Sequence, residues 1–112
     1  MSKNLEWVGR SLHDIRDFPE DARREAGHQL NLVQLGFEPD DYRPMPSVGP
    51  GVVEIRIHTE TEHRVFYVTK HGDTVFVLHA FQKTTRQTSK HDIEVGKERL
   101  KEVRRWLRDR NQ

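Results

Sequence analysis

The residues best suited to chemistry on an anionic substrate lie in an apolar stretch near the middle of the chain. His79, Phe81 and Lys83 alternate there, so in a strand they share one face. An aromatic ring can stack on an unpaired base, an ammonium can hold a phosphate, and an imidazole can carry a proton near neutral pH. This combination indicates RNA chemistry. The competing interpretation is that His79 is a hydrogen-bonded, partly buried residue and that Lys83 merely flanks the strand end.

Two arginines occur in the apolar stretches that precede this segment. Arg56 and Arg64 are permanently charged and can each hold a phosphate through two parallel hydrogen bonds. An arginine in an apolar strand is costly to bury, so it needs either a partner or an open face. Both arginines can act on one phosphate only if they share a sheet face. Alternatively, they form structural ion pairs with nearby carboxylates, for which Glu54, Glu60 and Glu62 are available.

The charge of the chain is unevenly distributed. The net charge is only +1. Residues 1–50 carry 6 Lys and Arg against 9 Asp and Glu, whereas residues 51–112 carry 13 against 9. No acidic residue lies between His79 and His91, a segment that contains Lys83, Arg86 and Lys90. Because a local basic patch attracts an anion more than net charge does, Arg86 and Lys90 are candidate RNA-binding residues.

Several function classes are disfavoured by what the sequence lacks. The chain has no cysteine, which excludes disulfide, thiolate and cysteine-zinc chemistry. Its seven histidines do not fall at a known ligand spacing, so we expect neither a metal site nor a cofactor. No glycine-rich phosphate loop or nucleophile elbow is present. Without an apolar run long enough for a membrane span, or a signal-peptide pattern, we expect a cytoplasmic protein with no membrane association.

The local patterns predict one domain, residues 1–112, with the order β-α-α-β-β-β-α. A short strand over 5–8 is followed by a helical hairpin over 11–35, which Pro19 divides in two. Ser11 with Asp14, and Ser89 with Asp92, have the spacing of helix-capping pairs. The proline-rich segment 37–51 is predicted to be a loop. Three strands, 52–58, 64–69 and 74–81, then lead to a helix that ends near 108.

These elements imply an α+β fold, with helices against a small twisted sheet that is mainly antiparallel. On the first of the three strands, Val53, Ile55 and Ile57 are predicted to share one face. On the third, Val75 and Val77 are predicted to share the face of His79 and Phe81. The opposite face of that strand is then expected to consist of Phe76, Leu78 and Ala80.

Three sequence blocks resemble the phage-derived, HigB-like branch of the RelE/HigB toxins of type II toxin–antitoxin systems. They are VVEIR at 52–56, HRVFY at 63–67 and VLHAFQK at 77–83, and a looser likeness extends over about residues 5–105. The third block is fairly specific, and the others gain weight from their order. The resemblance implies a RelE-like fold. It also implies cleavage of messenger RNA, usually on the ribosome, by attack of the ribose 2′-hydroxyl on the adjacent phosphate without a metal.

The resemblance also implies residue roles. Arg64 matches the family's strand arginine and would neutralise the phosphate as it gains charge. Arg56 and Lys83 would hold neighbouring phosphate oxygens, and His79 would be the candidate proton carrier. Phe81 would stack on a base or pack in the core, and Arg43, ahead of the loop, would add a phosphate contact. Such toxins are paired with an antitoxin, so we expect a cognate antitoxin partner, of helix-turn-helix type.

Two positions depart from the family pattern. Thr84 stands where a second lysine is usual, and His63 stands where a tyrosine is common. The first change weakens the basic patch, and the second shifts a stacking or proton-transfer role. A ParE-like toxin, which inhibits DNA gyrase by binding and is no nuclease, is the main alternative. A nucleic-acid-binding regulator is disfavoured because the chain shows no helix-turn-helix pattern of its own.

Overall fold

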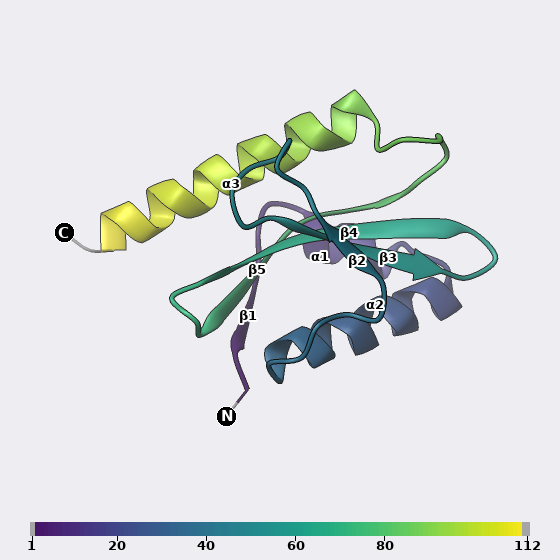
Figure 1. Cartoon of the computed structure of the whole chain (residues 1–112), viewed down its shortest axis with the longest axis horizontal. Helices are drawn as coiled ribbons and strands as arrows, with labels where there is room; N and C mark the ends of the chain where they lie inside the picture. The colour runs from purple at the N-terminus through teal and green to yellow at the C-terminus, as the bar shows by residue number, and fades with distance from the viewer. Residues whose placement is uncertain (1, 111–112) are drawn as a thin grey trace.

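A five-stranded sheet lies between two helical layers in the computed structural model, which describes residues 2–110 (Figure 1). The strand order is β1-β5-β4-β3-β2. In sequence order the elements are β1 (Asn4–Trp7), α1 (Ser11–Arg16), α2 (Glu20–Gln34), β2 (Tyr42–Pro44), β3 (Val53–His58), β4 (Glu62–Lys70), β5 (Thr74–Gln82) and α3 (Lys90–Arg110).

The predicted α+β class and element order are confirmed, with one additional strand. β2 lies within the proline-rich segment that was expected to be only a loop, and it pairs antiparallel with β3 at the sheet edge. Pro44 is tolerated there because an edge strand has one side that needs no hydrogen-bond donor. β1 pairs in parallel with β5, so the sheet is mixed, and its three central strands are antiparallel.

One face of the sheet packs against α1 and α2. The helical stripe of Ala22, Ala26 and Leu30 contacts strand residues that include Ile55 and Ile57. Val53, Ile55 and Ile57 therefore share a face, as predicted from their alternation. Figure 1 shows α2 below the sheet and α3 above it.

The opposite face packs against α3 and the segment between β2 and β3. Leu100 and Val103 of α3 are almost fully buried there, and Phe66 of β4 is the largest fully buried side chain. Gly96 allows the close approach of helix and sheet, because a Cβ at this position would lie 2.9 Å from Phe66 and from Val48. No helix among residues 2–110 is both long and apolar enough to cross a membrane.

A β-bulge changes which face His79 and Phe81 occupy. In the pairing of β4 with β5, Phe66 lies opposite His79, but the next residue, Tyr67, lies opposite Val77. Leu78 is therefore the extra residue of the bulge. Val77 packs with α1 and α2, whereas Leu78 and Phe81 pack on the α3 face. The predicted strict alternation on this strand was therefore wrong, because a bulge inserts one residue and reverses the side-chain parity beyond it.

The two predicted capping pairs have different outcomes. Ser11 is not a cap, because its hydroxyl donates to the carbonyl of Val77 at 3.0 Å and the N-cap residue of α1 is Arg10. Ser89 does cap α3, since its oxygen accepts from the Asp92 backbone N–H at 3.1 Å and its hydroxyl donates to the Asp92 carboxylate at 2.6 Å.

Candidate functional site

Three arginines come together on the α3 face of the sheet, near the end of β3. Arg56 lies directly opposite Arg64 in the antiparallel β3–β4 pair, so the two share a face as the proposed chemistry requires. Arg64 in turn lies opposite Phe81 of β5. In the neighbouring row, Arg43 of β2 lies opposite Glu54, which lies opposite Phe66. The register of four strands thus places these groups in two adjacent rows.

One carboxylate oxygen lies at the centre of the three guanidinium groups. Glu54 Oε1 is 3.2 Å from Arg43 Nε, 3.8 Å from Arg64 Nε and 3.9 Å from Arg56 Nε. The other oxygen of Glu54 accepts a hydrogen bond of 2.7 Å from the Thr88 hydroxyl. Glu54 is fully buried. We call this set of Arg43, Glu54, Arg56 and Arg64 the arginine cluster.

The three arginines differ in how much they present to solvent. The side-chain exposure is 44% for Arg43, 34% for Arg56 and only 7% for Arg64. Arg64 uses Nη1 to donate to Glu62 at 3.0 Å and to the carbonyl of His63 at 2.9 Å. The structural ion pairs that the sequence analysis gave as an alternative are therefore present. Within the arginine cluster, Arg43 and Arg56 are more accessible to solvent than Arg64.

His58 links two carboxylates that lie beside the arginine cluster. His58 contacts Asp41 through Nε2 and lies 2.8 Å from Glu62 through Nδ1. Hydrogen bonds to Asp41 and Glu62 raise the pKa of His58, and the contact with His58, followed by that with Arg64, lowers the pKa of Glu62. Because Asp41 also lies 4.0 Å from Arg56, the charges of the cluster are largely balanced within the protein.

His79 lies behind Phe81, on the side of the cluster nearest α3. The two rings are stacked, with centroids 4.8 Å apart. His79 Nε2 is 2.8 Å from an Asp92 carboxylate oxygen, while Nδ1 is buried and has no hydrogen-bond partner among residues 2–110. Burial lowers the pKa of His79 despite the opposing effect of Asp92, which favours the neutral ring. The geometry thus joins β5 to the first turn of α3.

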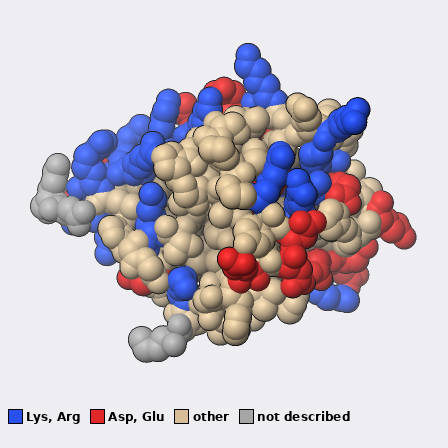
Figure 2. Space-filling model, viewed as in Figure 1, with Lys and Arg blue, Asp and Glu red and all other residues tan. Residues whose placement is uncertain are grey.

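The basic residues beyond β5 form an exposed loop beside the cluster. The backbone N–H of Lys83 donates a hydrogen bond to the carbonyl of Glu62, two residues before Arg64. Its ammonium donates to the carbonyls of Thr85 and Arg86 at 2.9 and 2.7 Å, so it is turned toward its own loop. Arg86 and Lys90 are exposed. In Figure 2, Lys and Arg atoms gather over α3, whereas Asp and Glu atoms gather near the β3–β4 turn.

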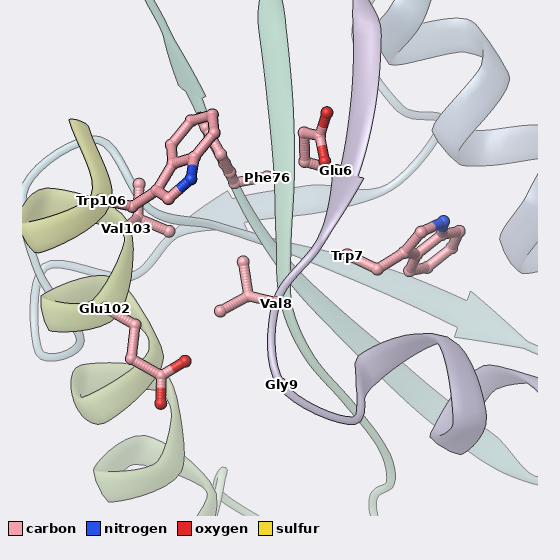
Figure 3. Close-up of a pocket in the computed structure, with 8 residues that line it drawn as sticks. All are labelled: Glu6, Trp7, Val8, Gly9, Phe76, Glu102, Val103 and Trp106. Atoms are coloured by element: carbon pink, nitrogen blue, oxygen red, sulfur yellow. The ribbon is translucent and has the colours of Figure 1, made fainter. Parts of the chain in front are cut away.

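A groove between β1 and α3 is a different kind of site (Figure 3). Phe76, Val103 and Trp106 give it an apolar wall, and its charged lining residues are the carboxylates Glu6 and Glu102. Since none of the described residues that line it is a Lys or Arg, this groove is poorly suited to a phosphate. Among residues 2–110, no group of three or more His, Asp or Glu side chains is arranged to hold a metal ion.

Sequence reasoning did not predict the central position of Glu54, the role of Thr88 or one contact of Asp92. Glu54 was considered only as an ion-pair partner, and Thr88 and the Asp92 contact with His79 were not anticipated. The available signal was an acidic residue in the strand sequence VVEIR, between positions that alternate into the core. A carboxylate at such a position needs several partners to be buried.

The chain matches the model of the family described as phage derived protein Gp49-like (DUF891) over residues 13–101. It belongs to the Gp49-like family. This match confirms the resemblance to the phage-derived branch that was inferred from the three sequence blocks. Among curated proteins, none matches this chain.

The Gp49-like chain also shares a fold with a solved toxin. It is similar to the free state of the Escherichia coli toxin RelE, in a mutant with two arginines changed to alanine. The TM-score is 0.62 at 21% sequence identity, and the match covers 92% of this chain and 99% of RelE. The expected RelE-like fold is therefore confirmed. At this identity the likeness concerns the fold alone.

Proposed function

We propose that this chain is the toxin of a type II toxin–antitoxin system and that it cleaves messenger RNA on the ribosome. The observation that carries the proposal is the arginine cluster, in which arginines from three neighbouring strands share one sheet face. Membership of the Gp49-like family and the RelE fold support the same conclusion.

The proposed reaction is attack of a ribose 2′-hydroxyl on the adjacent phosphate, with departure of the 5′-oxygen. Arg64 stabilises the charge that develops on the phosphate, Arg56 and Lys83 hold its oxygens, and no metal or other cofactor is required. Lys83 must turn from its loop carbonyls to do so. Arg43 contacts a flanking phosphate, Phe81 stacks on a base, and Arg86 and Lys90 guide the strand.

His79 is the candidate proton carrier of this reaction. Its neutral ring at pH 7 suits a base, and Asp92 fixes Nε2. Because Nδ1 is buried, the side chains that surround it must move before it can reach a substrate oxygen.

A toxin of this kind needs a partner that keeps it inactive. We propose a cognate antitoxin with a helix-turn-helix domain, acting with the toxin in the cytoplasm. Co-expression from the adjacent reading frame, followed by purification of one complex, tests this part of the proposal. Recovery of the chain alone, with unimpaired host growth, would contradict it.

The nuclease activity is tested by primer extension on a messenger RNA in a purified translation system. The wild type should cut only in the presence of ribosomes and leave a 2′,3′-cyclic phosphate, the product of 2′-hydroxyl attack. Arg64→Ala should lose cleavage, whereas Arg105→Ala, an exposed arginine on α3, should retain it. Products with 5′-phosphate ends would rule out this mechanism. Intact RNA together with inhibited DNA gyrase would favour a ParE-like inhibitor instead.

A further inference from the structure

A buried carboxylate with no part in the proposed reaction lies at the centre of the site. Glu54 has 0% relative exposure, although it carries a charged group on a strand between Val53 and Ile55. Burial of a carboxylate is strongly unfavourable unless charges and hydrogen bonds compensate it. Glu54 is compensated on both sides of its carboxylate, and the two sides belong to different parts of the fold.

The first oxygen, Oε1, holds the arginines. It lies within 4.0 Å of the Nε atoms of Arg43, Arg56 and Arg64. The Nε atoms of Arg56 and Arg64 are buried and make no hydrogen bond to the described residues. Arg64 also pairs with Glu62 through Nη1 at 3.0 Å, and Arg56 lies 4.0 Å from Asp41. Glu54 is the carboxylate that the two arginines share, and at 3.8 and 3.9 Å from their Nε atoms it acts on both through its field rather than through a single directed bond.

The second oxygen, Oε2, holds the loop between β5 and α3. It accepts a hydrogen bond of 2.7 Å from Thr88, whose side chain is buried. This loop contains Lys83 and Arg86 and leads to Lys90, the other basic residues of the proposed RNA path. A single carboxylate thus connects the strand arginines to the basic loop.

We propose that Glu54 is the positioning residue of this site: its buried carboxylate aligns Arg56 and Arg64 and fixes the adjoining basic loop for RNA cleavage. The inference rests on the proposed function. Without this anion, three like charges on adjacent strands would repel one another. An arginine that is free to swing can still attract RNA, but it does not meet the transition state in a defined orientation.

This role predicts opposite effects on binding and on turnover. Glu54→Gln keeps the size of the side chain and can still hydrogen-bond Thr88, but it removes one negative charge from an RNA-binding surface. RNA should therefore bind at least as well, so KM should not rise. Since misplacement of a catalytic group costs up to about 100-fold in rate, kcat should fall by roughly 10- to 100-fold.

The matched control is Glu60→Gln. Glu60 is exposed in the β3–β4 turn and makes no ion pair with the described residues, so the change alters net charge equally without touching the arginines. We expect kcat to stay within about twofold of the wild type. A folded Glu54→Gln protein with wild-type kcat, or one with increased kcat/KM, would overturn the positioning role.

A second variant and a second measurement cover the case in which Glu54→Gln does not fold. Thr88→Val keeps the negative charge of Glu54 and removes only its contact with the loop, so it should lower kcat several-fold. If Glu54→Gln does not fold, a wild-type kcat in Thr88→Val would overturn the inference. NMR of the arginine Nε–H groups gives a readout independent of activity. Two slowly exchanging signals in the wild type should exchange faster in Glu54→Gln or, where that variant does not fold, in Thr88→Val. If the wild type cleaves no RNA, the proposed nuclease function is wrong. Separately, unchanged exchange of the arginine Nε–H protons in whichever of the two variants folds would overturn the positioning role.

Discussion

At the scale of single residues, the arginines of the site are held by the protein's own carboxylates. Arg64 has 7% side-chain exposure and contacts both Glu54 and Glu62. A buried arginine with two acidic partners is well fixed, which favours an electrostatic role that depends on orientation. Arg43 and Arg56, with 44% and 34% exposure, are the members that a phosphate reaches first.

The first prediction concerns the planar shape of Arg64. Arg64→Lys keeps the positive charge but replaces the guanidinium fork with a single ammonium. We expect the single-turnover rate of ribosomal mRNA cleavage to fall about 100-fold, comparable to loss of one transition-state donor, while Tm changes little. A Lys variant that retains more than half of the wild-type rate would show that charge alone suffices.

The second prediction concerns His79 and pH. Burial is the main cause that lowers the pKa of His79 in the folded protein. Below about pH 6.5, the ordinary pKa of histidine, the unfolded chain therefore takes up a proton that the folded protein does not. This contribution to stability is complete above pH 6.5 and is lost as the pH falls toward the folded pKa. His63, whose pKa is also lowered by burial, adds an effect of the same sign.

Comparison with His79→Gln isolates this contribution, since glutamine does not titrate. Urea unfolding at pH 7.5 and pH 5.5 should show a larger loss of unfolding free energy in the wild type than in the variant. Parallel losses in the two proteins would mean that His79 keeps its ordinary pKa when folded.

At the scale of elements, the position of α3 controls the site. α3 contributes Leu100 and Val103 to the core beside Phe66, and its first turn supplies Asp92, which holds His79. The Ser89 cap fixes where this helix begins. Any change that lifts α3 from the sheet therefore disturbs His79 and Phe81 together.

The third prediction compares two helical glycines. Gly96→Ala places a Cβ 2.9 Å from Phe66 and Val48, so it should destabilise the protein by about 1–3 kcal/mol through overpacking. Gly27 of α2 has open space at its Cβ position, so Gly27→Ala should stabilise by about 0.5–1 kcal/mol through helix propensity. Thermal unfolding of both variants checks the signs, and equal shifts would contradict the close packing of α3.

At the scale of the whole molecule, charge is separated along the surface. The net charge is only +1, yet Lys and Arg atoms gather over α3, whereas Asp and Glu atoms gather near the β3–β4 turn (Figure 2). Because Glu54, Glu62 and Asp41 already balance much of the charge of the arginine cluster, the exposed Arg86 and Lys90 should dominate long-range attraction of RNA.

The fourth prediction measures that attraction. For a 2′-O-methyl RNA oligonucleotide, which cannot be cleaved, replacing both Arg86 and Lys90 with alanine should reduce the slope of log K against log salt by about 1.4. This figure follows from about 0.7 per phosphate contact on a single strand. The matched pair is Arg105 and Arg108, both exposed on α3. An equal reduction for that pair would place the RNA path along α3.

Local patterns in the sequence were sufficient for the order of all elements except β2 and for the cap of α3 at Ser89. They also indicated Arg56 and Arg64, whereas Arg43 came from the family resemblance, and the roles of all three remain a proposal. Alternation and short polar turns are properties of neighbouring residues, so β3, β4 and β5 could be predicted from them. The family resemblance was likewise carried by three continuous blocks. β2 escaped prediction because three residues with a proline become a strand only when β3 is available to pair with them.

What only the tertiary structure decided is how these residues meet. The bulge at Leu78, which places His79 and Phe81 on the α3 face, depends on how β4 pairs with β5 and leaves no mark in the sequence of either strand. Likewise, Glu54 becomes the centre of the arginine cluster because β2, β4 and the loop after β5 approach it from three directions. The sequence by itself determined which groups are available, and long-range strand pairing determined their partners, because pairing depends on contacts between distant segments.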